Sequence, residues 1–149
     1  MIRTIRAVLI LAVVGMGVGA VVAQTDPISA RKDLMKQSNK FAKSVNAMAK
    51  GEEPFTSETV AAAYATWDKT ANEYGKLFPD NSKEGGNTRA KAVIWEKRKD
   101  FDAKVAAFAK AVAEGKPKAS SLDGVKAAMP AINDACNNCH EIYRAPQKK

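Results

Sequence analysis

The chain has 149 residues, of which 46% are hydrophobic and 27% charged, and its formal net charge is +8. This length and composition indicate a single domain, and abundant Ala and Lys with few β-branched runs favour an all-α fold. The positive charge does not indicate a nucleic-acid-binding protein, because the lysines are interspersed with acidic residues and form no basic run with aromatics.

Residues 1–23 are predicted to be a cleaved signal peptide. Two arginines precede the apolar stretch Ala7–Val22, and small side chains lead to a cleavage site after Ala23. A retained membrane anchor is the alternative, but the stretch is short for a bilayer span and glycines interrupt it. The mature domain, residues 24–149, is therefore expected in the periplasm, with no membrane span and a net charge lowered from +8 to +6. Such a charge allows steering towards a partner with an acidic surface.

Four amphipathic helices are predicted along the mature domain. Apolar residues recur in each at steps of three and four, the spacing that places them on one helix face. The first helix has Asp26 as its N-cap and Pro27 at its first position, and it ends at Gly51. The second begins at Ser57 or the residue before it and ends before Pro79.

A polar, non-periodic run over residues 79–88 is the one long loop expected. The third helix is predicted from about Arg89 to Glu114, and the fourth from Ser121 or the residue before it. Pro130 lies inside the fourth helix and predicts a kink or a break, or a helix that restarts there. With short first and third connections, these helices indicate an antiparallel up-down-up-down four-helix bundle.

The fourth helix carries the pentapeptide Cys136-Asn-Asn-Cys139-His140, which contains both cysteines and the single histidine of the chain. Thiols three residues apart lie on one helix face, where they can add to the two vinyl groups of one haem, and the adjacent imidazole can bind iron. A zinc site needs a fourth ligand, a redox dithiol favours a strand-to-helix turn, and a disulfide at this spacing is strained. We therefore interpret the pentapeptide as a covalent haem-attachment site.

This haem motif lies on the last of four helices behind a signal peptide and continues through Tyr143 and Arg144. In this it resembles the cytochrome c′ family, the class II c-type cytochromes, over the whole mature chain. The resemblance implies one haem c, single-electron transfer with a redox partner, and often a homodimer formed through the first two helices. An enzyme is not expected, because the sequence offers no nucleophile with a base, no carboxylate pair and no phosphate-binding loop.

The resemblance extends to two branches that differ at the sixth iron position. In the high-spin branch an apolar residue of the first helix shields an open distal site, whereas in the low-spin cytochrome c-556 type a methionine binds there. The stretch Arg31–Lys36 resembles the low-spin pattern and places Met35 at the distal position. If Leu34 faces the iron instead, the expected protein is a five-coordinate cytochrome c′ that binds nitric oxide or carbon monoxide.

Helix geometry independently favours Met35 as the partner of His140. The start of the first helix lies beside the end of the fourth in an antiparallel bundle. Met35 lies about 12 Å into its helix and His140 about 9 Å before the end of its own, so their levels match. Met48 and Met129 lie about 20 Å and 16 Å from that level. An ordinary core thioether is the alternative role for Met35.

Arg31 and Arg144 complete the candidate site. Each lies within about one turn of an expected ligand, and the resemblance implies that they pair with haem propionates or shield the proximal histidine. Exposed arginines at helix ends are the alternative.

Overall fold

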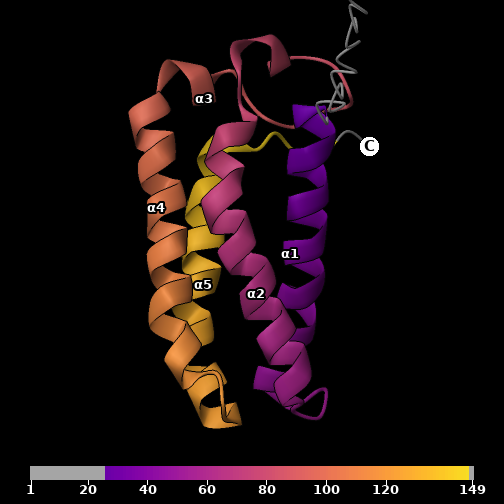
Figure 1. The fold of residues 1–149 in the computed structure, drawn as a ribbon, viewed down its shortest axis with the longest axis vertical. Coiled ribbons are helices and arrows are strands. Elements are labelled where there is room, and N and C mark those ends of the chain that lie inside the picture. Colours follow the sequence, from indigo (N-terminus) through magenta and orange to yellow (C-terminus); the bar gives the residue numbers. More distant parts are fainter. Residues whose placement is uncertain (1–25, 148–149) are drawn as a thin grey trace, which may run out of the picture.

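The computed structural model describes residues 26–147, so the predicted signal peptide lies outside the described residues. Four long helices account for most of this range: α1 (Pro27–Lys50), α2 (Ser57–Glu73), α4 (Arg98–Gly115) and α5 (Leu122–Tyr143). Helix α1 packs on α2 and α5, and α4 packs on the same two helices (Figure 1). Successive long helices run in opposite directions, which confirms the predicted four-helix bundle (Figure 1). No helix within residues 26–147 is long and apolar enough to cross a membrane.

The ends of α1 and the start of α5 lie where the sequence predicts them. The Asp26 carboxylate accepts a hydrogen bond from the backbone N–H of Ser29 (2.9 Å), which would otherwise lack a partner at a helix start. Gly51 ends α1 with a φ of 78°, a left-handed conformation that glycine adopts without a Cβ clash. The Ser121 hydroxyl caps α5 by accepting the N–H of Gly124 (3.1 Å).

The predicted third helix begins later than the sequence indicates. Residues 89–91 do not join it, because their backbone pairs with the chain that follows α5: the Lys91 N–H donates to the Tyr143 carbonyl (3.0 Å), and Ala90 forms an isolated antiparallel bridge with Arg144. The short helix α3 (Val93–Glu96) follows, and only then does α4 begin. Hydrogen bonds to a distant part of the chain therefore override the helical pattern of this stretch.

The second predicted helix ends earlier than expected, and the fourth is not interrupted at Pro130. Helix α2 ends at Glu73, and residues Tyr74–Leu77 continue as a 3₁₀ turn whose carbonyls accept hydrogen bonds from arginine side chains. Helix α5 runs without a break through Pro130, whose exposed ring lies on the outer face of the bundle. The helix thus tolerates the missing hydrogen bond at Pro130, because buried residues before and after the proline pack it against the bundle.

The hydrophobic core is divided along the length of the bundle. One cluster fills the half where α1 ends and α5 begins, and it includes the buried residues Val45, Trp67, Val112, Val125 and Ile132. A smaller aromatic cluster, containing Phe78, Phe101 and Tyr143, lies at the opposite end, where α4 begins and α5 ends. Each such large side chain contributes about 1.5–3 kcal/mol on burial. The space between the two clusters is where the candidate site lies.

Candidate haem site

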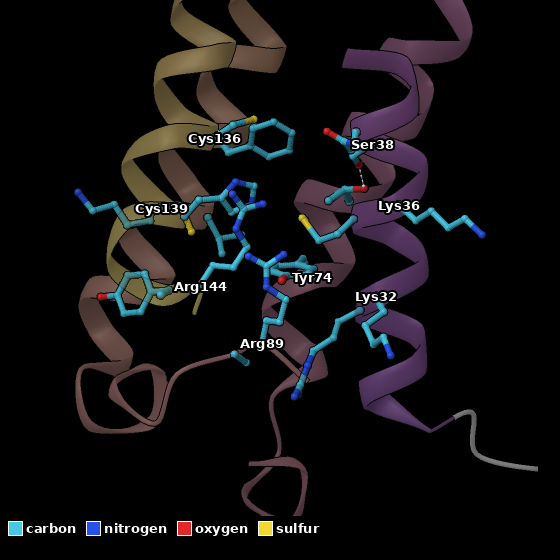
Figure 2. A pocket seen from close by; sticks show the side chains of 18 of the residues that line it. Lys32, Lys36, Ser38, Tyr74, Arg89, Cys136, Cys139 and Arg144 are labelled. Atoms are coloured by element: carbon cyan, nitrogen blue, oxygen red, sulfur yellow. Dashed lines mark hydrogen bonds between the residues drawn. The ribbon is translucent and has the colours of Figure 1, made fainter. Parts of the chain in front are cut away.

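A cavity of about 630 Å³ opens between α1 on one side and α4 and α5 on the other. Residues of all four long helices and of the segment 87–90 line it. Figure 2 shows Cys136 and Cys139 on α5 and Ser38 on α1 on opposite sides of this space. The cavity therefore separates the helix of the haem motif from the helix of the predicted distal ligand.

The α5 wall holds all three reactive residues of the pentapeptide, since Cys136, Cys139 and His140 each line the cavity. Burial is the main cause that lowers the pKa of His140 to about 4, and the nearby charges of Arg144 and Arg89 lower it further. Burial also raises the pKa of the Cys136 thiol to about 11, and the neighbouring Cys139 adds to this shift. At neutral pH this wall thus presents two protonated thiols and a neutral imidazole whose nitrogen lone pair can bind a metal.

The α1 wall distinguishes between the two candidate distal residues. Met35 is half-buried and lines the cavity, whereas the neighbouring Leu34 is buried and is not among the lining residues. Met48 and Met129 lie in the core cluster at the other end of the bundle. Among the methionines of residues 26–147, Met35 is thus the one that shares a cavity with His140.

Arg31 borders the cavity, and its guanidinium makes contacts that the sequence analysis did not predict. Its side chain is buried, with 2% of its surface exposed, and its guanidinium lies 4.6 Å above the Phe78 ring. It donates four hydrogen bonds to residues 77–88: to the Leu77 carbonyl, the Ser82 hydroxyl and carbonyl, and the Thr88 hydroxyl. Four of its five N–H donors are engaged in these contacts. The two-pronged face that would hold a propionate is therefore occupied by the protein itself.

Arg144 lines the cavity as expected, and the structure adds Arg89, which the sequence analysis did not single out. Figure 2 shows both side chains in the space between α5 and α1. The Arg89 Nε donates to the Ala145 carbonyl (2.8 Å), which orients the rest of the guanidinium. No local pattern indicates this role for Arg89, because the long-range pairing with the chain after α5 brings it to the site.

The size and lining of the cavity fit a haem. Its volume lies within the range of roughly 300–1,000 Å³ typical of cofactor pockets. Trp67, Phe101 and Phe108 supply apolar walls suited to a porphyrin, and the arginines at the mouth suit its carboxylates. An imidazole on one wall and a thioether on the other are ligands that haem iron takes. When bound, haem supplies a one-electron couple between ferric and ferrous iron.

Comparisons with known proteins give the same assignment. The family model of cytochrome c′ matches residues 26–144. Among curated proteins, cytochrome c-556 of Rhodopseudomonas palustris is 38% identical over 94% of this chain and 97% of its own length. Cytochrome c′ of the same organism is also 38% identical, over 95% of this chain and 97% of its own. A structural model of oxidised R. palustris cytochrome c556 superimposes with a TM-score of 0.75 and 38% identity, covering 84% of this chain and all of that one.

The match extends over nearly all the described residues, and its range includes all four long helices and the pentapeptide Cys136–His140. Cytochromes of this kind carry haem c with its iron and act as electron carriers or gas-binding haemoproteins. The relatives include both a cytochrome c-556 and a cytochrome c′ at equal identity, so the comparison does not separate the two branches. The chain belongs to the cytochrome c′ family.

Proposed function

We propose that this protein is a periplasmic electron carrier of the low-spin cytochrome c-556 type. In this proposal Cys136 and Cys139 attach one haem c, His140 is the proximal ligand and Met35 is the distal ligand. The observation that carries the proposal is that Met35 lines the same cavity as the haem motif, whereas Leu34 does not. The protein acts by holding both ligands in place while a single electron enters or leaves, and no chemical bond of a substrate is changed.

The chain's own residues have separate tasks in this role. The thioether of Met35 is a soft ligand that favours ferrous over ferric iron, so it raises the reduction potential. The neutral imidazole of His140 would supply the other ligand, and thioether bonds from Cys136 and Cys139 would keep that helix attached to the cofactor in either redox state. The aromatic side chains of the cavity exclude water, which lowers the solvent rearrangement that accompanies a change of charge. Arg89 and Arg144 lie where propionates would carry negative charge.

The second candidate function is gas binding at a five-coordinate iron. Met35 is half-buried, and a methionine side chain has three rotatable bonds, so it can turn aside more readily than a fully packed residue. The distal side would then be an open apolar pocket, as binding of nitric oxide or carbon monoxide requires. The relative named cytochrome c′ supports keeping this alternative.

Spectroscopy of the purified holoprotein tests both parts of the proposal. An alkaline pyridine spectrum of the c type, with a mass increased by one haem, is expected for covalent attachment through both cysteines. The ferric protein is expected to be low-spin with the weak red-end sulfur-to-iron band, and the ferrous protein is expected to bind carbon monoxide slowly. A high-spin ferric spectrum with rapid carbon monoxide binding would replace electron transfer by gas binding.

The surface around the cavity mouth supports an acidic redox partner. Lys32, Lys36, Lys104, Arg89 and Arg144 line the cavity or its rim, and Asp33 is the acidic residue among the lining side chains. A cationic rim beside the cofactor attracts a partner of opposite charge and orients it towards the site of electron transfer. A homodimer through α1 and α2 stays a prediction, which the mass of the holoprotein in solution tests.

A further inference from the structure

The buried guanidinium of Arg31 connects α1 to three points of one segment. It binds Leu77 through the carbonyl (3.0 Å), Ser82 through both hydroxyl and carbonyl (3.0 and 2.8 Å), and Thr88 through the hydroxyl (2.8 Å). Ser82 is itself buried, and its hydroxyl donates to the Pro79 carbonyl (2.9 Å). None of these partners is a carboxylate, so the contacts define a geometry rather than neutralise a charge. A planar guanidinium with several fixed donors is suited to this task.

The other end of the same segment is bonded to the chain that follows the haem motif. The carbonyl of Arg89 accepts the Ala145 N–H (2.8 Å), and the Lys91 N–H donates to the Tyr143 carbonyl (3.0 Å). The Arg89 side chain adds a third bond, from its Nε to the Ala145 carbonyl (2.8 Å). Backbone and side chain therefore hold this end to the last residues of α5 and those just beyond it.

Thr88 joins the two ends into one hydrogen-bonded connection. Its hydroxyl oxygen accepts from the Arg31 Nη2 (2.8 Å) and also from the Ala90 N–H (3.2 Å). Residues 77–91, which we call the strap, thus run from α1 to the end of α5 and supply part of the cavity wall at Thr88, Arg89 and Ala90. A chain of bonds this short transmits a displacement of one helix to the other.

We propose that the strap fixes the separation of the two ligand-bearing helices, and that Arg31 is a positioning residue for Met35. Arg31 lies four residues before Met35 on α1, on the same helix face and one turn away. At the opposite end the strap binds Tyr143, three residues after His140 on α5. The strap therefore links the helical turn before Met35 to the helical turn after His140. This inference rests on the proposed His140 and Met35 ligation.

A strap of this kind decides how often the methionine reaches the iron. Ligand atoms must be held within about half an ångström of their productive positions by the residues that support them. If α1 moves outwards, the bond between the Met35 thioether and the iron is the first to be lost. Met35 is on α1, whereas the two cysteines and the proximal histidine that would hold the haem are on α5. Loss of the strap is thus expected to shift the holoprotein towards the five-coordinate, gas-binding form while the bundle stays folded.

Two variants of the strap and one control test the proposal in the holoprotein. Arg31→Met keeps an unbranched, flexible side chain but removes all four hydrogen bonds, and Thr88→Val removes only the hydroxyl that joins the two ends. Arg98→Met is the matched control. Arg98 donates to the carbonyls of Gly75 (2.7 Å) and Phe78 (3.4 Å) but makes no hydrogen bond to Ser82, Thr88 or the end of α5. The control therefore removes arginine contacts to residues 75–78 but leaves intact the hydrogen bonds that join α1 to the end of α5 through the strap.

The readouts are the sulfur-to-iron band of the ferric protein and the rate of carbon monoxide binding to the ferrous protein. Arg31→Met is expected to weaken the band and speed carbon monoxide binding about tenfold, in proportion to the fall in methionine-bound population. Thr88→Val is expected to act in the same direction with a smaller change, and Arg98→Met to leave both readouts as in the wild type. Amide exchange at residues 88–91 should become faster in the two strap variants alone.

The outcomes separate this inference from the proposed function. If the wild type itself lacks the band, Met35 does not ligate and the proposed function fails together with the inference. If the wild type shows the band and both strap variants keep it, the positioning role is wrong while the electron-carrier proposal stands. Should Arg31→Met not fold, the nearly isosteric Thr88→Val decides by itself, because an unchanged band in that variant overturns the inference.

Discussion

Replacing Met35 by leucine separates iron ligation from packing. The two side chains have similar volumes, and such exchanges change the free energy of unfolding by less than about 1.5 kcal/mol. Leucine is also as favourable in a helix interior as methionine. Met35 is only half-buried, so the cost at this position lies at the low end of that range. The helical content of Met35→Leu is therefore expected to stay close to that of the wild type.

The effect on the iron is expected to be large, because the described residues offer no substitute thioether. Met48 and Met129 are both 3% exposed and packed in the core cluster away from the cavity. A methionine that occupies the sixth position in about 99% of molecules lowers the apparent affinity for an external ligand about a hundredfold. Removing it should raise the carbon monoxide affinity by that factor and lower the reduction potential, since the ferrous-favouring sulfur is lost.

The assay compares Met35→Leu with the control Met48→Leu, which makes the same exchange in the core. We expect a high-spin ferric spectrum, a lower potential and fast carbon monoxide binding in the first variant and none of these in the second. The reasoning is refuted if Met35→Leu remains low-spin with an unchanged potential. That result would leave Met35 as a packing residue and move the assignment to the five-coordinate branch.

Three other predictions concern stability, pH and partner binding. A Cβ added at Gly115 would lie 2.6 Å from the Tyr64 hydroxyl, so Gly115→Ala should lower the free energy of unfolding by about 1–3 kcal/mol in urea titrations. Adding Tyr64→Phe should recover most of this loss, because it removes a buried hydroxyl that has no partner in residues 26–147. Hydrogen bonds from the Ser29 backbone and side chain lower the Asp26 pKa below 3.8, so Asp26→Ala should reduce stability at neutral pH. The difference should disappear as the pH falls through the lowered pKa; a constant difference down to about pH 2 would contradict the capping role. Lys36→Gln should slow electron transfer to an acidic partner more at low salt than Lys43→Gln, which lies away from the cavity, and equal effects would argue against the rim as the docking surface.

The sequence alone determined the features that depend on neighbours in the chain. Asp26 and Gly51 set the limits of α1 because a capping carboxylate and a left-handed glycine act on backbone groups a few residues away. The spacing of Cys136, Cys139 and His140 likewise puts all three on one helix wall wherever the helix packs. The placement of Met35 opposite them also followed from the sequence. The rise per residue gives the height of Met35 above the start of its helix, and this matches the height of His140 below the end of the antiparallel fourth helix.

Only the tertiary structure decided the features that depend on distant segments. Residues 89–91 did not join the predicted third helix, because their backbone forms its bonds with the end of α5 and the chain after it. Arg31 was predicted to pair with a haem propionate or to shield the proximal histidine, with an exposed arginine as the alternative. In the structure the loop buries it and accepts hydrogen bonds from its guanidinium. Helix propensity contributes less than about 1 kcal/mol per residue, so one or two hydrogen bonds to a distant segment are enough to overturn it. Such pairings leave no periodic signal in the sequence, because they depend on two distant segments that only the folded chain brings together.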